Sequence, residues 1–252
     1  MSKFKKKKQP KTRWQKIWYF IWDDDSIWSW IVNIIIAFIL IKFLVYPGLG
    51  LFFGSTHPVV AVVSGSMEHK TVHPCLAYEQ NQGSLQGGMQ CKTINKEVYG
   101  ICGVNFDENK RVNLDFFWET CGEFYKTYNI NKLDFEEFDF KNGFNTGDIM
   151  VLFGFKPEKV GVGDVIVFRS TNQNQAEPII HRVIKVWQED GMYYYKTKGD
   201  HNSDTHSFEA TIGEDRVIGK AVFRIPFLGN IKIWFVQLLS LLRLDMIIEV
   251  FN

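Results

Sequence analysis

The chain has 252 residues, of which 46% are hydrophobic, 15% aromatic and 23% charged, and its formal net charge is +1. This composition excludes a disordered chain, a collagen-like chain and a polytopic transporter, and the near-zero charge argues against a dedicated nucleic-acid binder. The length suffices for one or two domains with a hydrophobic core. Four cysteines are too few for a small fold held together mainly by disulfides.

The charge is unevenly distributed along the chain. Residues 1–16 contain eight basic residues and no acid, whereas the remaining 236 residues contain 21 basic and 28 acidic residues. We predict that residues 1–25 form a basic cytosolic tail. Within it, the aromatic stretch 13–22 is expected to form a short amphipathic helix on an anionic lipid surface.

An apolar run follows from Ile27 to Tyr46, with Lys42 as its one charge, and Pro47 ends it. A helix of this length spans ~30 Å, the thickness of the hydrocarbon core of a bilayer. We therefore predict a transmembrane helix over 26–47, with Ser26 as a good N-cap. A buried core helix and a cleaved signal peptide are the alternatives, but the run lacks the small residues of a cleavage site. The basic tail places the N-terminus in the cytosol and everything after Pro47 on the other side.

The exported part begins with short runs rich in β-branched and aromatic residues, which are separated by Gly, Pro, Asn and Asp. These runs predict strands at 58–64, 148–153, 164–169, 178–187, 192–198 and 216–224. No βαβ rhythm is present. The expected fold class is mainly β, with a small antiparallel and partly closed catalytic domain formed by 55–67 and 146–228.

Residues 68–145 differ in character and are predicted to be an insertion made of helix and loops that caps the β domain. The apolar spacing at 114–125 predicts a helix. All four cysteines (Cys75, Cys91, Cys102 and Cys121) fall in this insertion, and one or two disulfides are expected on the exported side. Free thiols are the alternative, and a metal site is disfavoured because no Cys-x-x-Cys pair exists.

The C-terminal stretch 229–252 contains an apolar run interrupted by three polar residues, Lys232, Gln237 and Arg243. This pattern favours a membrane-associated surface helix over a second full span or a packed helix.

Three separate segments carry the side chains of a nucleophile, a base and an acid. Ser64-Gly65-Ser66 follows the first strand beyond the membrane helix, His181 lies inside a predicted strand, and Asp200 and Asp204 follow the next strand. Serine, histidine and aspartate together form the usual constellation of nucleophilic catalysis. Alternation along the strand puts His181 on one face and Arg182 on the other.

In their order along the chain, these segments resemble type I signal peptidase of the archaeal and endoplasmic-reticulum branch. The resemblance covers about residues 26–67 and 146–240. It is carried by the transmembrane helix, Ser-Gly-Ser-Met-Glu at 64–68, Thr-Gly-Asp-Ile at 146–149, Gly-Asp-Val-Ile-Val-Phe at 163–168, Ile-His-Arg-Val at 180–183, Thr-Lys-Gly-Asp-His-Asn at 197–202, Val-Ile-Gly-Lys at 217–220 and Ile-Pro-Phe-Leu-Gly at 225–229.

The resemblance implies a role for each matching residue. Ser66 corresponds to the nucleophile, and His181 stands where the bacterial branch has a lysine base. Ser64 and the Ser66 N–H correspond to the oxyanion donors. A histidine is partly neutral near pH 7, whereas a lysine must lose more than three pKa units to act as a base.

The orienting acid is the least certain of these assignments. The family has an Asp in Gly-Asp-x-Asn and a second Asp about six residues later, whereas here Asp200 fits the first position and Asp204 follows after four residues. We predict Asp204 as the orienting acid, with Asp200 structural or sharing the role. The chain departs from the family again at His69, where a proline is usual, and in the long insertion that leaves the chain beside Ser66.

These features predict a membrane-bound serine endopeptidase that removes N-terminal signal peptides from exported preproteins. Val62, Val63 and Met67 are the predicted substrate-binding residues, beside a strand to which an extended substrate adds. No metal or cofactor is expected. Preproteins, membrane lipid and partner subunits or translocation machinery are the expected partners, at the cell membrane or endoplasmic-reticulum membrane. The alternatives are a catalytically silent subunit of the same fold, and a soluble self-cleaving protease of the repressor type, against which the membrane helix and His181 argue.

Overall fold

The computed structural model describes residues 12–72, 77–80, 89–92, 98–171 and 178–230. The chain divides into two compact units, one up to Phe52 and one from Phe53 onward, and each is described by itself. The predicted C-terminal membrane helix and most of the basic residues of the tail lie outside the described residues.

The N-terminal unit consists of a short helix followed by a long one. α1 (Arg13–Trp22) begins at a capping box between Thr12 and Gln15, which confirms the helix predicted at 13–22. α2 (Ile27–Leu40) begins at Ser26, whose hydroxyl accepts a hydrogen bond from the Ser29 amide at 3.3 Å, as expected of this N-cap. The Asn33 side chain donates to a carbonyl of α1 and so ties the two helices together.

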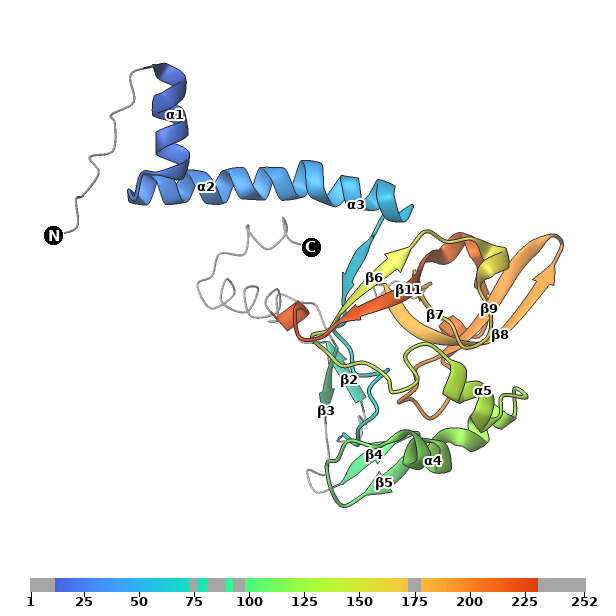
Figure 1. Ribbon diagram of the computed structural model, residues 1–252. Helices are drawn as coiled ribbons and strands as arrows, with labels where there is room; N and C mark the ends of the chain where they lie inside the picture. The colour runs from blue at the N-terminus through green and yellow to red at the C-terminus, as the bar shows by residue number, and fades with distance from the viewer. Residues whose placement is uncertain (1–11, 73–76, 81–88, 93–97, 172–177, 231–252) are drawn as a thin grey trace. The chain divides into compact units, whose positions relative to one another are not determined.

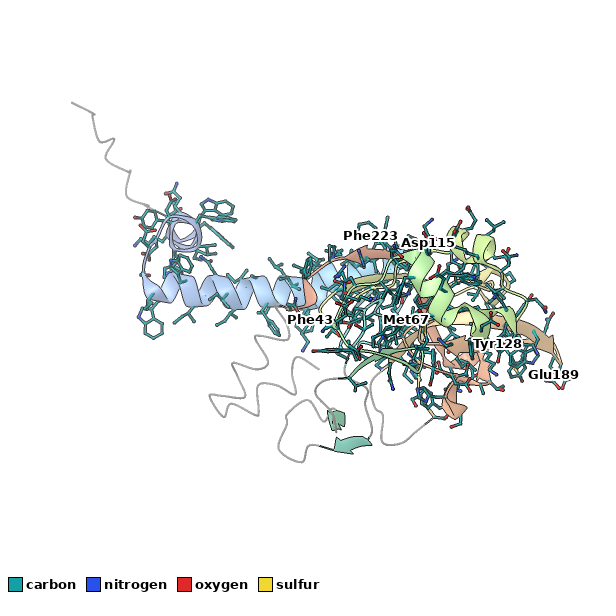
Figure 2. The ribbon with its side chains drawn as sticks, turned by 90° about the horizontal axis from the view of Figure 1, so that it is seen from below. Phe43, Met67, Asp115, Tyr128, Glu189 and Phe223 are labelled. Carbon is teal, nitrogen blue, oxygen red and sulfur yellow. A yellow bond between two sulfur atoms is a disulfide. The ribbon has the colours of Figure 1, made fainter. Side chains whose placement is uncertain are left out.

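The sequence predicted that the long helix ends at Pro47, but in the structure the helix continues beyond this residue. It passes through a π-helical turn, η1 (Ile41–Val45), and continues as α3 (Tyr46–Phe53). Proline removes one backbone donor and its ring collides with the carbonyl four residues earlier. The wider π turn ends two residues before Pro47, contains Phe43 four residues before the proline, and shifts the hydrogen-bond pattern there. The apolar helix therefore runs over 27 residues, Ile27–Phe53, with a mean hydropathy of 2.3, and it is long and apolar enough to cross a membrane. Most of its large apolar side chains, such as that of Phe43, are exposed (Figure 2).

The second unit is built around a seven-stranded antiparallel sheet with the strand order β1-β6-β11-β7-β8-β9-β10 (Figure 1). The sheet curls into a half-barrel, which confirms the predicted fold class. Its strands are β1 (Val59–Ala61), β6 (Ile149–Phe153), β7 (Val165–Phe168), β8 (Ile179–Glu189), β9 (Met192–Lys198), β10 (Ile212–Gly213) and β11 (Val217–Ile225). All six predicted strands are present, and the two-residue β10 was not predicted.

Turn chemistry and bulges give the sheet its shape. β8 and β9 form a long hairpin in which Glu189 pairs with Met192, and the two residues between them, Asp190 and Gly191, both have positive φ. An Asp-Gly pair is well suited to such a tight turn, because glycine adopts this conformation without steric cost. Register shifts in β11 and in the β8–β9 pair mark bulges, which bend strands and increase their twist.

The sheet is buried on both faces at its centre. All four residues of β7 are buried, with Val165 and Val167 in one hydrophobic cluster and Ile166 and Phe168 in another. Successive side chains of a strand point to opposite faces, so β7 contributes to a core on each side. This explains why the sequence of β7 is continuously apolar instead of alternating.

The described residues of the insertion form two helices and two small hairpins. The predicted helix at 114–125 is confirmed as α4 (Leu114–Lys126), which is capped by Asn113, and α5 (Lys132–Glu137) follows it. The other elements, which the sequence did not predict individually, are η2 (Pro157–Lys159), η3 (Ser207–Glu209), η4 (Glu214–Arg216), β2 (Ala77–Gln80), β3 (Met89–Lys92), β4 (Tyr99–Ile101) and β5 (Val104–Phe106); η2, η3 and η4 lie outside the insertion. One or two disulfides were expected without a pairing, and the structure has a disulfide between Cys102 and Cys121.

Candidate active site

The site lies where the first strand of the sheet ends beside β8. Ser66 follows β1 in a turn, and His181 projects from β8. The His181 Nε2 atom lies 2.9 Å from the Ser66 hydroxyl oxygen, although 115 residues separate the two in sequence. The His181 ring is buried, whereas Ser66 is partly exposed. The sheet therefore brings together the serine and the histidine that the sequence predicted, and it leaves the hydroxyl accessible.

The carboxylate that meets the histidine belongs to Glu209. Its Oε2 atom lies 2.5 Å from His181 Nδ1 and also accepts a hydrogen bond of 2.7 Å from the Thr197 hydroxyl. Its other oxygen accepts the His206 amide at 3.1 Å, and this places Glu209 at the end of the short helix η3. Glu209 is fully buried, so the carboxylate has a fixed orientation toward the ring.

Neither of the two predicted aspartates contacts the His181 ring in this structure, which differs from our expectation. Asp200 is fully buried, but it is paired with the Arg182 guanidinium, at 2.7 Å between Arg182 Nη2 and Asp200 Oδ2. Asp204 is exposed and accepts a hydrogen bond from the Thr205 amide. The physical reason is the loop: it turns Asp200 toward the opposite face of β8 and leaves Asp204 in solvent, so that the chain returns to the ring only at Glu209.

Glu209 was not predicted from the sequence because it lies nine residues after Asp200, beyond the spacing of about six that the family resemblance implies. The available signal was weak: an acid three residues after His206, a spacing that suits a short helical turn. Burial and a hydrogen-bond partner, which identify this carboxylate, follow only from the tertiary fold.

The electrostatics of the site set the protonation of the ring nitrogens. Burial by itself would raise the pKa of Glu209, but the facing His181 ring and the hydrogen bonds from the ring, the His206 amide and Thr197 outweigh it and hold this pKa below its usual range. A carboxylate at Nδ1 favours the tautomer with a proton on that nitrogen. Nε2 is then free to accept the proton of the Ser66 hydroxyl.

Two hydrogen-bond donors lie beside the serine oxygen. The Ser66 amide donates to the Ser64 hydroxyl oxygen at 3.2 Å, and that hydroxyl lies 3.3 Å from the Ser66 hydroxyl. Ser64 is exposed, so both groups are at the surface where a substrate would lie. Gly199 closes the other side, because a Cβ atom there would lie 2.7 Å from the Ser66 carbonyl oxygen and 2.8 Å from His181 Nε2. Only glycine allows this close approach.

The three predicted substrate-binding residues have different environments. Val62 and Met67 are buried in the hydrophobic core of the sheet, where Figure 2 labels Met67, so their side chains do not line a surface pocket. Val63 is 53% exposed and lies between them in sequence. β1 is an edge strand that pairs with β6 on one side. Contacts with an extended ligand would therefore come from the backbone of this segment and from Val63.

Among the residues that the structure describes, no group of three or more His, Cys, Asp or Glu side chains is placed to hold a metal ion. The chemistry that the arrangement can perform is nucleophilic attack by a hydroxyl, with an adjacent base and a carboxylate that orients the base. A serine–histidine–carboxylate geometry of this kind is the one that serine hydrolases use on several unrelated folds.

Comparison with known proteins leads in the same direction. The chain is 33% identical over 81 residues to the signal peptidase complex catalytic subunit sec11 of Schizosaccharomyces pombe, covering 30% of this chain and 42% of that protein. It is 31% identical over 96 residues to the human signal peptidase complex catalytic subunit SEC11C, covering 36% and 49%. The corresponding Dictyostelium discoideum subunit is 30% identical over 96 residues, covering 36% and 52%.

These similarities confirm the resemblance to signal peptidases of the endoplasmic-reticulum branch. The chain spans about half the length of the curated relatives that it matches. No family model matches the chain.

Proposed function

We propose that this protein is a membrane-bound serine endopeptidase that removes N-terminal signal peptides from exported preproteins. The observation that carries the proposal is the line of contacts from the Ser66 hydroxyl through the His181 ring to the Glu209 carboxylate. The names of the relatives, which are catalytic subunits of a signal peptidase complex, support the substrate class.

In the proposed reaction, the Ser66 hydroxyl attacks the carbonyl carbon of the scissile peptide bond. His181 takes the hydroxyl proton through Nε2 and later gives it to the leaving amine. Glu209 replaces the predicted aspartate as the orienting acid, because it is the carboxylate at Nδ1. Its negative charge stabilises the imidazolium that forms while the serine is bonded to the substrate.

The developing negative charge on the carbonyl oxygen needs donors of its own. The Ser66 amide and the Ser64 hydroxyl lie next to each other, and both could turn from their mutual hydrogen bond to the oxyanion. One such donor contributes about 3–4 kcal/mol of transition-state stabilisation in comparable enzymes. The role predicted for Ser64 and Ser66 is therefore kept in the proposal.

Substrate binding follows from the edge position of β1. An extended segment of the preprotein would add as a strand beside 59–63 and present its scissile bond to Ser66. Because Val62 and Met67 are buried, we assign the side-chain contact on this segment to Val63 alone. The apolar helix Ile27–Phe53 would anchor the protein in the endoplasmic-reticulum or cell membrane, with the N-terminus in the cytosol and Ser66 on the far side.

The alternative of a catalytically silent subunit predicts that the serine or the histidine is lost or displaced. Both residues are present and their reacting atoms are within hydrogen-bond distance, which favours the enzyme. The relatives are named as subunits of a complex, so we include partner subunits among the expected partners, together with preproteins and lipid.

The proposal is tested with a reporter preprotein and the full chain in membranes. We expect the wild type to release the signal peptide, and both Ser66→Ala and His181→Ala to reduce cleavage by at least a thousandfold. Ser203→Ala, an exposed serine in the nearby loop, is the matched control and should cleave normally. Wild-type rates in the Ser66 and His181 variants would contradict the mechanism.

A further inference from the structure

The insertion packs on the face of β8 that lies opposite to His181. His181 points toward Ser66, whereas its neighbour Arg182 points to the other side, where its guanidinium lies 5.1 Å from the ring centroid of Phe135 in α5. Ile184, on the same face as Arg182, belongs to the buried hydrophobic cluster of the insertion together with Phe117 and Tyr125 of α4. The strand that carries the histidine is therefore covered from behind by the insertion.

The two regions meet at the carboxylate of Asp200. Its oxygens accept hydrogen bonds from Arg182 Nε at 2.9 Å and from the Tyr125 hydroxyl at 2.9 Å, and His69 Nε2 lies 3.1 Å away. All four side chains are buried. Tyr125 comes from α4 of the insertion, Arg182 from β8, and His69 from the beginning of the insertion, three residues after Ser66. One carboxylate thus joins the insertion, the histidine strand and the nucleophile turn.

His69 strengthens this junction on the nucleophile side. It stands three residues after Ser66, and its ring stacks on Phe117 of α4 with 3.8 Å between centroids and 7° between planes. Its Nδ1 is the one buried side-chain polar atom without a hydrogen-bond partner in the described part of the chain. The ring is therefore held by Asp200 and by Phe117, and not by a wider polar network.

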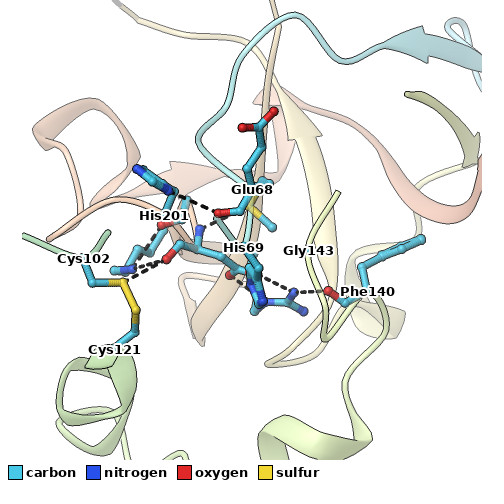
Figure 3. Close-up of polar contacts among 12 residues, drawn as sticks. Glu68, His69, Cys102, Cys121, Phe140, Gly143 and His201 are labelled. Carbon is cyan, nitrogen blue, oxygen red and sulfur yellow. Dashed lines mark hydrogen bonds and ion pairs between the residues drawn. A yellow bond between two sulfur atoms is a disulfide. The ribbon is translucent and has the colours of Figure 1, made fainter. Parts of the chain in front are cut away.

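A second connection runs through the backbone and the disulfide (Figure 3). The His201 amide donates to the Ser66 carbonyl oxygen at 2.8 Å, and the Cys102 amide donates to the His201 carbonyl oxygen at 2.9 Å. Cys102 is covalently bonded to Cys121 in the middle of α4. The nucleophile turn is thus connected to α4 through the 199–202 loop as well as through His69.

From these contacts we infer that the insertion is a positioning part of the active site: Tyr125 and Phe117 of α4 hold Asp200 and His69, and through them they set Ser66 against His181. This inference rests on the proposed function for its effect on cleavage. It assigns α4 a role in catalysis although none of its side chains contacts the serine or the histidine ring in the described structure. We call Tyr125, Phe117 and His69 positioning residues.

The sharpest test removes one oxygen atom. Tyr125→Phe deletes the hydroxyl that donates to Asp200 and keeps the ring in the core, and Tyr128→Phe is the matched control three residues later, where the half-buried ring packs on Phe124. We expect Tyr125→Phe to lower kcat about tenfold without a comparable change in KM, because one hydrogen bond to a charged acceptor is lost. Tyr128→Phe should leave kcat unchanged.

Amide hydrogen exchange on the full chain in detergent provides a readout that does not depend on activity. In Tyr125→Phe we expect faster exchange at the amides of His201 and Asn202, which donate to the Ser66 and Gly199 carbonyls. The paired variant Cys102→Ser/Cys121→Ser, which cuts the second connection, should show the same increase and the same loss in kcat. If Tyr125→Phe fails to fold, this paired variant still tests whether α4 positions the 199–202 loop and Ser66.

The outcomes separate this inference from the proposed function. If the wild type shows no Ser66-dependent cleavage, the proposed function fails, and the exchange data still decide whether α4 holds the loop. Equal exchange in Tyr125→Phe and Tyr128→Phe would overturn the inference. Faster exchange with unchanged kcat would also overturn it, because α4 would then be a structural support without influence on the serine.

Discussion

The two faces of β8 differ in what they bury and in what they leave open. On one face, His181 Nε2 contacts the partly exposed Ser66, and the Glu209 carboxylate contacts His181 Nδ1. On the other face, Arg182 is fully buried against the insertion and donates to Asp200 and to three backbone carbonyl oxygens. Catalysis requires access and a base that can change its charge, whereas the reverse face keeps its charges permanently paired. The comparison shows that the strand that carries His181 is fixed on its reverse face by buried, paired charges.

The largest expected effect distinguishes Glu209, the acid that contacts His181, from Asp204, the acid that the sequence favoured. Glu209→Gln should lower kcat by about 10⁴-fold, because the amide cannot stabilise the imidazolium or select its tautomer as a carboxylate does. Asp204→Asn changes an exposed acid in the preceding loop and should cleave at the wild-type rate. Steady-state cleavage of a reporter preprotein measures both. A large loss in Asp204→Asn with normal Glu209→Gln activity would restore the original prediction.

On the reverse face the expected effect is on stability. Asp200→Asn should destabilise the fold by about 3–5 kcal/mol, because it leaves the buried Arg182 without its negative partner. The measurement is denaturant unfolding of the full chain in detergent. The neighbouring surface change Asp204→Asn is again the control, and its unfolding midpoint should not move.

The same pair has a defined pH dependence. Although burial would raise the pKa of Asp200, the Arg182 guanidinium and the hydrogen bonds from His69 and Arg182 hold it far below its usual range. A carboxyl whose pKa is lowered by folding stabilises the protein fully above its unfolded pKa of about 3.9. This contribution is lost as the pH falls through the folded pKa. The stability difference between wild type and Asp200→Asn should therefore be constant at neutral pH and shrink below about pH 4.

Lys198 is expected to give a second rise of stability with pH, at alkaline pH. Burial lowers its pKa from 10.5 to about 8, and its ammonium lies 4.9 Å from the ring centroid of Phe124. Since the unfolded chain binds the proton more tightly, stability should rise between pH 8 and 10.5, by about 3 kcal/mol from this group. Lys198→Met removes the titrating group and should flatten this part of the curve. Identical slopes in both proteins would show that Lys198 keeps an ordinary pKa.

The smallest effect concerns the N-cap of α4, Asn113. Asn113→Ala removes the side-chain oxygen that accepts the Phe116 amide at 2.9 Å and should cost about 1 kcal/mol. Thermal unfolding would detect it, and kcat should stay normal. A tenfold loss in kcat would show that the catalytic residues depend on the whole of α4 and not only on its inner face.

Much of the architecture was predictable because local patterns are strong. The β-branched runs predicted six of the seven strands of the large sheet, and the apolar spacing at 114–125 predicted α4. The apolar helix extends past its predicted end because the π turn η1 accommodates Pro47, although proline usually stops a helix. β10 has only two residues and no pattern that a sequence could reveal.

The sequence by itself determined the parts of this protein whose chemistry is local. The apolar run from Ile27, the strand alternation that separates His181 from Arg182, and the order of segments that resembles a signal peptidase can all be read along the chain. The tertiary structure alone decided which acid reaches His181 and what the insertion contacts. Glu209 and Asp200 are both acids near β8. Their environments differ because the intervening loop places Glu209 at His181 on one face and Asp200 at Arg182 on the other.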